Sequence, residues 1–205
     1  MRRLFANKKQ AELMLWHATR NKVDSDVPRH PADGMQWQSI NAEYQDFGGD
    51  PRNIRFGMST DGLNPFGNMS YRFSTWPAVL WMYNLPLWLY LKRKYIQLCM
   101  LIQGPKQPGS DLHMYHQLLY EELRTLWDGP PVKVWDAYMR EYFDLKALLF
   151  VTVQDYPALV YQSGQVVHGY KACVLCKEHT TTHRLAGSSK ILYMGHRRWL
   201  KETDE

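Results

Sequence analysis

Apolar residues gather in three successive segments that predict β-strands in the first half of the chain. Residues Ile54–Thr60 alternate enough to form a strand, which ends directly before Asp61. The segment Ala78–Leu85 contains β-branched and aromatic residues and is stopped by Pro86, as a second strand would be. A third strand is predicted over Lys94–Ile102, where the turn-rich sequence QGPKQPGS closes it.

The spacing of apolar residues changes after these strands, and the segment Asp111–Trp127 predicts an amphipathic helix. Spacings of three and four separate its apolar residues, which are Leu112, Tyr115, Leu119, Leu123 and Trp127. A further strand is predicted over Val132–Asp136. The apolar run Leu145–Val153 has little polar alternation, as expected of a strand covered on both faces, and it ends at Gln154 and Asp155.

This order of elements predicts an α/β fold with a mixed sheet and a crossover helix. Three consecutive strands, a crossover helix and a parallel central strand form the first half of the RNase H-like fold. In that fold, acidic residues from the ends of the first and fourth core strands meet at one edge of the sheet. We therefore expect such a core over residues 51–165.

Two further regions flank this expected core. Residues 1–50 predict a helix over 7–22 followed by a loop-rich segment dense in Pro, Gly, Asp and Asn, which runs on to residue 53. Residues 166–205 contain a CxxC motif and are expected to form a small metal subdomain. Because neither end of the chain has a capped closing element, we expect an internal piece of a longer protein.

Composition and charge fit a globular protein with a mild basic bias. Hydrophobic residues make up 45% of the 205 residues, and the net charge of +5 is compatible with a polyanionic partner without establishing one. Three cysteines, an odd number, argue against a disulfide framework and for a reducing compartment. The segment Trp76–Leu91 is short for a membrane span and contains Asn84 and Pro86, so we expect a buried strand and no membrane partner.

Asp61 and Asp155 are candidate ligands for a divalent cation. Each follows a predicted strand, and strands built between them would bring them together across 155 − 61 = 94 positions. Mg²⁺ prefers oxygen ligands and keeps several waters, so a few carboxylates plus substrate oxygens suffice to bind it. The alternative is structural: an Asp-Gly pair after a strand is usually a turn, and Asp-Tyr-Pro usually starts a loop or a helix.

The sequence YKACVLCKEHTTTHRL supplies candidate zinc ligands. Cys173 and Cys176 form a CxxC, which is half of a tetrahedral Zn²⁺ site. The remaining ligands would be His179 and His183, or His196, or residues outside this chain. A redox pair and two buried structural thiols are the competing interpretations.

Other charged and histidine residues give weaker indications. Short basic clusters beside aromatic residues are compatible with phosphate contact or with a solvated face; they contain Lys92, Arg93, Lys94, Arg197 and Arg198. Four more histidines are interpreted as surface or locally bonded residues: His17, His30, His113 and His116.

Several longer motifs resemble one known family from about Leu15 to Leu200. They are, in order, WHATR, RHPADG, DPRNIRFGMSTDGLNPFGNMS, STWP, YNLPLWL, GPKQPGSD, LWDG, QDYPA, ACVLC and GHRRWL. Together they resemble the transposases of plant CACTA (En/Spm-type) DNA transposons. The resemblance implies cut-and-paste transposition by a DDE core of RNase H-like fold with Mg²⁺ or Mn²⁺, in which water attacks the element ends and the freed 3′-hydroxyl attacks target DNA.

The resemblance also implies particular residues and partners. The first acidic residue of the family falls on Asp61, the second on Asp155, and its CxxC on Cys173 and Cys176. The third acidic residue is expected beyond Arg198, and none of the acidic residues of the tail is assigned this role; these are Glu202, Asp204 and Glu205. Implied partners are the terminal repeats and target DNA, an accessory DNA-binding protein of the transposon, and further copies on DNA, in the nucleus.

Departures from the family pattern leave two functions open. Val174 stands where the family has Pro in its Cys-Pro-x-Cys, Leu63 and Tyr156 each replace a Phe, and the segment after Asp155 differs from the usual Tyr-Gly-Asn-Leu-Ser-Gly. The first function is a transposase fragment that is inactive alone because it lacks an assignable third carboxylate. The second is a non-catalytic remnant or host-retained module that binds DNA or protein, with zinc as a structural staple.

Overall fold

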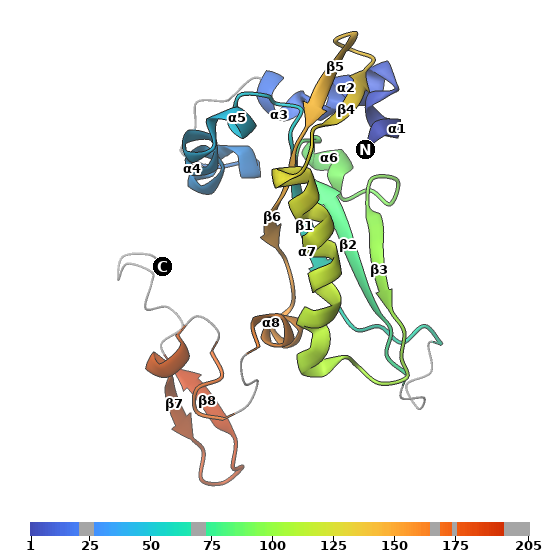
Figure 1. The fold of residues 1–205 in the computed structure, drawn as a ribbon. Helices are drawn as coiled ribbons and strands as arrows, with labels where there is room; N and C mark the ends of the chain where they lie inside the picture. Colours follow the sequence, from blue (N-terminus) through green and yellow to red (C-terminus); the bar gives the residue numbers. More distant parts are fainter. Residues whose placement is uncertain (21–26, 67–72, 165–168, 174–175, 195–205) are drawn as a thin grey trace.

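The computed structural model describes residues 1–20, 27–66, 73–164, 169–173 and 176–194, and it is a mixed α/β structure (Figure 1). Its helices are α1 (Arg2–Phe5), α2 (Lys8–Met14), α3 (Trp16–Thr19), α4 (Met35–Glu43), α5 (Gln45–Gly48), α6 (Leu87–Tyr90), α7 (Leu112–Asp128) and α8 (Tyr156–Ser163), with short 3₁₀ turns η1 (Pro31–Asp33), η2 (Gly109–Asp111) and η3 (Lys177–His179). Its strands are β1 (Ile54–Thr60), β2 (Trp76–Met82), β3 (Gln97–Ile102), β4 (Val132–Asp136), β5 (Glu141–Leu145), β6 (Ala147–Thr152), β7 (Thr181–Arg184) and β8 (Ile191–Met194).

Four strands form a mixed sheet in the spatial order β3-β2-β1-β6. β2 is antiparallel to both β1 and β3, whereas β6 runs parallel to β1. The β1–β6 register extends from Ile54 opposite Ala147 to Met58 opposite Thr152. A parallel pair needs a crossover connection, and the segment between β3 and β6 contains α7. The predicted mixed sheet with a crossover helix is therefore confirmed.

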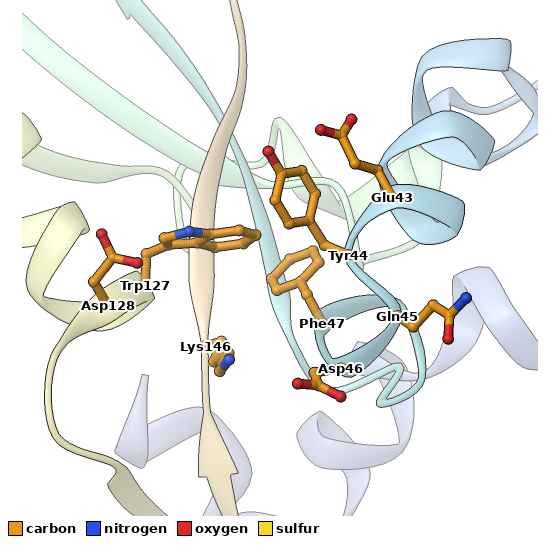
Figure 2. A pocket seen from close by; sticks show the side chains of 8 residues that line it. All are labelled: Glu43, Tyr44, Gln45, Asp46, Phe47, Trp127, Asp128 and Lys146. Carbon is orange, nitrogen blue, oxygen red and sulfur yellow. The ribbon is translucent and has the colours of Figure 1, made fainter.

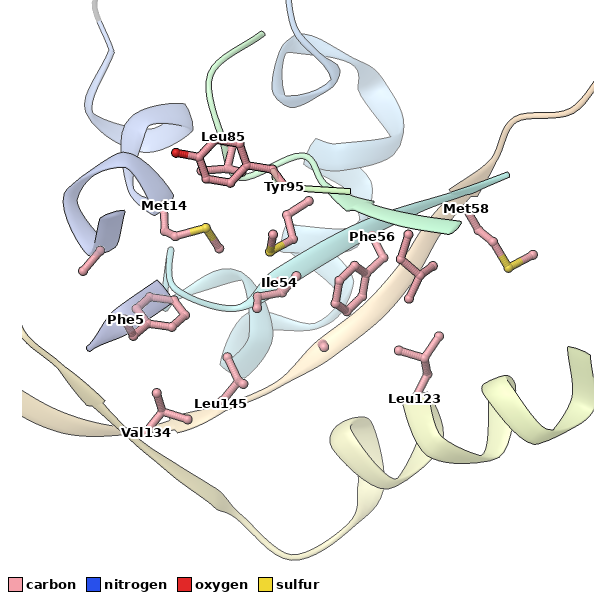
Figure 3. Close-up of a cluster of buried hydrophobic side chains, with 14 of the residues drawn as sticks. Phe5, Met14, Ile54, Phe56, Met58, Leu85, Tyr95, Leu123, Val134 and Leu145 are labelled. Atoms are coloured by element: carbon pink, nitrogen blue, oxygen red, sulfur yellow. The ribbon is translucent and has the colours of Figure 1, made fainter. Parts of the chain in front are cut away.

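Helix α7 covers one face of this sheet, as its apolar spacing predicts. Its buried residues recur at intervals of three and four; they are Leu112, His116, Leu119 and Leu123. Leu119 and Leu123 belong to the main hydrophobic core, together with Ile54, Phe56 and Met58 of β1 (Figure 3). These β1 positions are two residues apart, so their side chains point to the same face.

The N-terminal helices contribute to the same core. Phe5 of α1 and Met14 of α2 are fully buried among these residues. The ring of Phe5 packs edge-on against Phe143 of β5, with 5.0 Å between the ring centroids. The backbone carbonyl oxygen of Phe5 accepts a hydrogen bond from the Ala137 N–H. Residues of the first 50 positions therefore share one hydrophobic cluster with the sheet.

The opposite face of the sheet has a second, aromatic cluster. Trp37 of α4 packs there with Trp81 and Phe150. Arg55 of β1 is 1% exposed, and its guanidinium lies between the rings of Trp37 and Phe47, with 4.1 and 4.6 Å to the ring centroids. Burial lowers the pKa of Arg55 to about 10. The Arg55 side chain donates a hydrogen bond to the Asn41 side-chain oxygen.

Several expectations need correction. The stretch expected to be loop-rich contains helix α4, and strand β5 forms an antiparallel hairpin with β4 that the apolar pattern did not reveal. His17 and His116, interpreted as surface or locally bonded residues, are buried, whereas His30 is buried but locally bonded, because its Nδ1 accepts a hydrogen bond from the Ala32 N–H. Across the described residues, no helix is both long and apolar enough to cross a membrane, and the segment from Trp76 forms β2 and then the short α6.

Candidate functional site

Asp61 directly follows β1, and the surrounding pairing shows that its Asp-Gly dipeptide is not a hairpin turn. Thr60 pairs with Ala78 in the β1–β2 ladder, and Leu63 pairs with Thr75 in an isolated antiparallel bridge. From the first pair to the second, one strand advances by three residues, from Thr60 to Leu63, and the other goes back by three, from Ala78 to Thr75. The register is therefore unchanged across Asp61 and Gly62, which lie in an extension of the antiparallel pair.

Gly62 is needed at this position because the indole of Trp76 lies against its backbone. A Cβ on Gly62 would come within 2.8 Å of Trp76 Nε1. The ring is held by a hydrogen bond from Nε1 to the Ser74 hydroxyl at 2.8 Å. Asp61 itself is exposed, and its Oδ1 accepts a hydrogen bond from the Gly62 N–H at 2.7 Å.

Asp155 follows β6 and is the N-cap residue of helix α8. Its backbone is extended, and its Oδ1 accepts a hydrogen bond from the Ala158 N–H at 2.9 Å. This contact satisfies one of the free donors of the first helical turn. The carboxylate is exposed. The structural interpretation of Asp155 as a helix start is thus correct, but the cap uses only one of the two carboxylate oxygens.

Asp61 and Asp155 both lie beyond the carboxyl ends of neighbouring parallel strands. Met58 is in register with Thr152, and each aspartate comes three residues after its member of this pair. Adjacent strands of a sheet are about 4.8 Å apart. The two residues therefore emerge from the same edge of the sheet at matching positions. Carboxylate oxygens in such an arrangement suit a hard divalent cation.

A larger ligand set is not formed at this edge by the described part of the chain. No group of three or more His, Cys, Asp or Glu side chains that could hold a metal ion occurs among the described residues. From the described residues, the candidate donors at this edge are therefore Asp61 and Asp155 alone. Water and substrate oxygens would have to complete the coordination.

A polar network that the sequence analysis did not identify holds the backbone next to Asp155. Gln154 Nε2 donates to Gln162 Oε1 at 2.7 Å, and Gln162 Nε2 donates to the Tyr120 hydroxyl at 2.7 Å. These bonds join the end of β6 to α8 and α7. The only signal in the sequence was the position of Gln154 beside a candidate ligand, because its partners are separated from it by the fold.

His116 lies beside this network on α7. Its side chain is fully buried, and its ring centroid is 6.1 Å from that of Tyr120. Burial lowers the pKa of His116, and the nearby Gln162 side chain opposes this in part. The imidazole is therefore neutral near pH 7, as expected of a histidine that packs α7 against the sheet.

Cys173 and Cys176 precede the β7–β8 hairpin and are joined by a hydrogen bond, while residues 174 and 175 lie outside the described residues. The Cys176 N–H donates to Cys173 Sγ at 3.4 Å, and the Lys177 N–H donates to the Cys173 carbonyl oxygen at 2.8 Å. The thiolate is the form of cysteine that binds a metal ion. His183 is exposed on β7, and His196 lies outside the described residues.

The described basic candidates, Lys92, Arg93 and Lys94, are not near the two aspartates. Lys92, Arg93 and Lys94 are exposed in the β2–β3 connection, which follows the end of β2 that is remote from Asp61. They therefore lie at the opposite end of the sheet, near α6 in Figure 1. Arg197 and Arg198 lie outside the described residues.

Comparison with known proteins gives one match. Residues 25–205 match the family described as transposase family tnp2. The matched residues include the sheet, both aspartates and the CxxC motif. No match was found among curated proteins or among solved structures.

Proposed function

Because the chain belongs to the transposase family tnp2, we propose that it is part of the catalytic core of a cut-and-paste DNA transposase of the CACTA (En/Spm) type. The family implies DNA as the partner. The proposed reaction is divalent-metal-dependent cleavage at transposon ends followed by strand transfer to target DNA. The observation that supports it most directly is the matched register of Asp61 and Asp155 beyond β1 and β6.

An RNase H-like assignment is supported by the topology. The sheet order β3-β2-β1-β6, with one parallel pair and α7 in the crossover, agrees with the first half of that fold. The β4–β5 hairpin is an addition between α7 and β6. Such a sheet presents the carboxyl ends of its two parallel strands, β1 and β6, at one edge, where ligands of open α/β sheets commonly bind.

In this proposal, Asp61 and Asp155 hold Mg²⁺ or Mn²⁺ at the exposed sheet edge. The bound cation would stabilise the charge that develops on the attacking and leaving oxygens of the phosphodiester. Asp155 contributes its oxygens from a fixed helix start, because its cap bond and the Gln154–Gln162 pair restrain it. The third carboxylate is expected beyond Arg198, which lies outside the described residues.

Manganese binding tests this proposal directly. Mn²⁺ can be titrated into the protein and followed by electron paramagnetic resonance, with Asp61→Asn and Asp155→Asn as variants. Each variant should bind Mn²⁺ at least about tenfold more weakly, which corresponds to about 1.4 kcal/mol. Asp144→Asn is the matched control, because Asp144 is exposed in the β4–β5 hairpin and pairs with Lys133 at 3.3 Å. Equal affinity in all four proteins would exclude the site.

A zinc-stapled DNA- or protein-binding module is the second candidate, and the Cys176 N–H to Cys173 Sγ contact favours it. Cys173 and Cys176 would supply two thiolates, with His183 or His196 as further ligands. This module requires no divalent metal at the sheet edge. DNA binding that persists while Mn²⁺ binding is absent would support it over the transposase core.

The remaining partners and the location are proposed from the DNA substrate. The exposed cluster of Lys92, Arg93 and Lys94 is proposed to contact phosphates, as are Arg197 and Arg198. Assembly into an oligomer on DNA, an accessory DNA-binding protein and residence in the nucleus accompany the transposase proposal.

A further inference from the structure

A cavity of about 490 Å³ lies between the α4–α5 region and the C-terminal end of α7 (Figure 2). Its lining includes Glu43, Tyr44, Asp46, Phe47, Trp127 and Asp128, together with Lys146, which directly precedes β6. Lys146 precedes β6, whereas Asp155 follows it, so the cavity is at the end of the sheet remote from the two aspartates. It is therefore separate from the proposed catalytic edge.

Aromatic rings form the wall of this cavity. The Trp127 indole is 5.1 Å from the ring of Tyr44 and 4.9 Å from the ring of Phe47, measured between centroids. Figure 2 shows the three side chains pointing toward one another from α7 and from the α4–α5 region. Phe47 is 1% exposed and so fixes the base of the wall, whereas Trp127 is partly exposed and Tyr44 is exposed.

Negative charge predominates around these rings. The lining contains three carboxylates, Glu43, Asp46 and Asp128, against the single ammonium of Lys146. In the described part of the chain, no ion pair within 4.0 Å involves Glu43 or Asp46. Asp128 faces Arg124 at 3.7 Å on the exposed surface of α7, where such a pair contributes little.

The neighbouring Glu43 carboxylate raises the pKa of Tyr44 by a hydrogen bond and by its charge. Glu43 thus places a carboxylate next to the aromatic wall. This excess of negative charge is local to the cavity, because the whole chain has a net charge of +5.

Indole faces combined with carboxylates select an organic cation. A guanidinium group stacks on aromatic rings and donates hydrogen bonds from its edge to carboxylate oxygens. An inorganic divalent cation prefers a shell of oxygen ligands, whereas three of the residues that line this cavity are aromatic. A phosphate or a nucleic acid backbone would be repelled by three carboxylates.

We propose that this cavity binds an arginine side chain from a basic segment of a partner protein. The guanidinium would stack on Trp127 while Glu43, Asp46 and Asp128 face its N–H groups. The excess of acidic residues within a basic chain supplies the charge complementarity, which raises the association rate and rejects acidic partners. The cavity thus gives this chain a protein-binding site besides its DNA-binding surface.

Fluorescence anisotropy with a labelled peptide of sequence Gly-Arg-Gly-Arg-Gly tests the proposal on the full chain. The peptide should bind, and a peptide with Gln in place of both Arg should not. The double variant Glu43→Gln/Asp46→Asn should weaken binding of the Arg peptide at least about tenfold, because both side chains are exposed and their loss removes charge without disturbing the core. Glu12→Gln, at an exposed position of α2, is the control and should leave binding unchanged.

A Trp127→Leu variant measures the aromatic contribution separately. It should weaken binding of the Arg peptide more than binding of a Lys peptide, because guanidinium stacking depends on the indole face. Absence of Arg-peptide binding by the unmodified chain would overturn the proposal. Equal weakening by the double variant and by Glu12→Gln would also overturn it, as would displacement of the peptide by equimolar Mg²⁺.

Discussion

The Val153 N–H donates a hydrogen bond to the Met58 carbonyl oxygen at 2.8 Å. This bond continues the parallel β1–β6 ladder beyond the Met58–Thr152 pair. After this bond, the segments that follow β1 and β6 separate. Asp61 remains in register with β2, whereas Asp155 starts helix α8. The two carboxylates are thus positioned by different local structures, and their variants should differ in stability even where they agree in metal binding.

The cap of α8 predicts a difference between two substitutions of Asp155. Asp155→Ala removes the acceptor for the Ala158 N–H and should lower the free energy of unfolding by about 1 kcal/mol. Asp155→Asn keeps an oxygen at the cap position and should stay within about 0.5 kcal/mol of the unmodified chain. Urea denaturation followed by circular dichroism measures both values.

Metal binding separates the two roles of Asp155. Both variants should lose Mn²⁺ affinity to a similar extent, because each lacks the carboxylate. If Asp155→Asn lowered stability as much as Asp155→Ala, the cap would not depend on the side-chain oxygen. If Asp155→Asn retained full Mn²⁺ affinity, the residue would be only a cap.

The sequence predicts the bounds of elements with regular apolar spacing more closely than those of the other elements. The bounds of β1 and β4 agree with the prediction, and α7 differs by one residue at each end, because each of these segments has a regular apolar spacing. Strand β5 was missed because its turn uses Ala137–Arg140 without Gly or Pro, and Arg140 itself adopts a φ of 60°. Helix α4 was missed because its apolar residues do not form one buried stripe: Trp37 is buried, but Met35 is 83% exposed.

The candidate site was predictable only in part, because local sequence patterns do not encode contacts between distant segments. Both aspartates could be identified from their positions after strands, but their matching register depends on how β6 aligns with β1, which no local pattern encodes. The Gln154–Gln162–Tyr120 network and the Tyr44–Trp127 wall join residues that are distant in sequence. Such contacts are set by packing, and local propensity does not determine them.

Gly57 predicts a steric effect at the centre of β1. A Cβ at this position would overlap the indole ring of Trp81, which is 5% exposed and packs edge-on against Tyr83 at 5.8 Å. The ring has little space to move, so Gly57→Ala should cost about 1–3 kcal/mol of stability. Chemical denaturation of the variant measures this loss.

Gly187 provides the matched control for this substitution. A Cβ there meets no atom within 4 Å, and Gly187→Ala should change stability by less than about 0.5 kcal/mol. A Gly57→Ala protein as stable as Gly187→Ala would show that the Trp81 ring is not confined.

The buried histidines predict a loss of stability in acid. Burial lowers the pKa of both His17 and His30 to about 4, with the positive charges of Arg55 and Arg20, respectively, acting in the same direction, and it also lowers the pKa of His116. The unfolded chain therefore binds more protons than the folded chain between about pH 6.5 and pH 4. Stability should be full above pH 6.5 and should fall with decreasing pH through this range, by about 1.4 kcal/mol per pH unit for each such proton.

Urea midpoints at several pH values between 7 and 4 measure this slope. His17→Gln should make the slope shallower, because one protonation is removed from the unfolded chain alone. His113→Gln should leave the slope unchanged, since His113 is exposed. A stability that stays constant from pH 7 to pH 4.5 would show that the histidines are protonated while the protein is folded.

Arg55 predicts an unusual order of substitution effects. Its charge is buried between Trp37 and Phe47, and no ion pair within 4.0 Å involves it among the described residues. Arg55→Lys keeps a charge that cannot stack in the same way, and it should cost about 3 kcal/mol. Arg55→Met removes the charge and keeps the apolar stem, so it should be the less destabilising of the two. A higher denaturation midpoint for Arg55→Lys than for Arg55→Met would contradict this account of the buried guanidinium.

The CxxC motif predicts a zinc site whose loss can be separated from general cysteine chemistry. Under reducing conditions the chain should bind Zn²⁺ in competition with a chromophoric chelator, and Cys173→Ser should weaken binding at least about tenfold, because it removes a thiolate ligand. Cys99→Ser is the control, since Cys99 is exposed on β3 and remote in sequence from the motif. His183→Ala should weaken binding only if this histidine, rather than His196, completes the site. Zinc affinity that is equally low in Cys173→Ser and Cys99→Ser, or absent from the unmodified chain, would leave the CxxC as a pair of structural thiols.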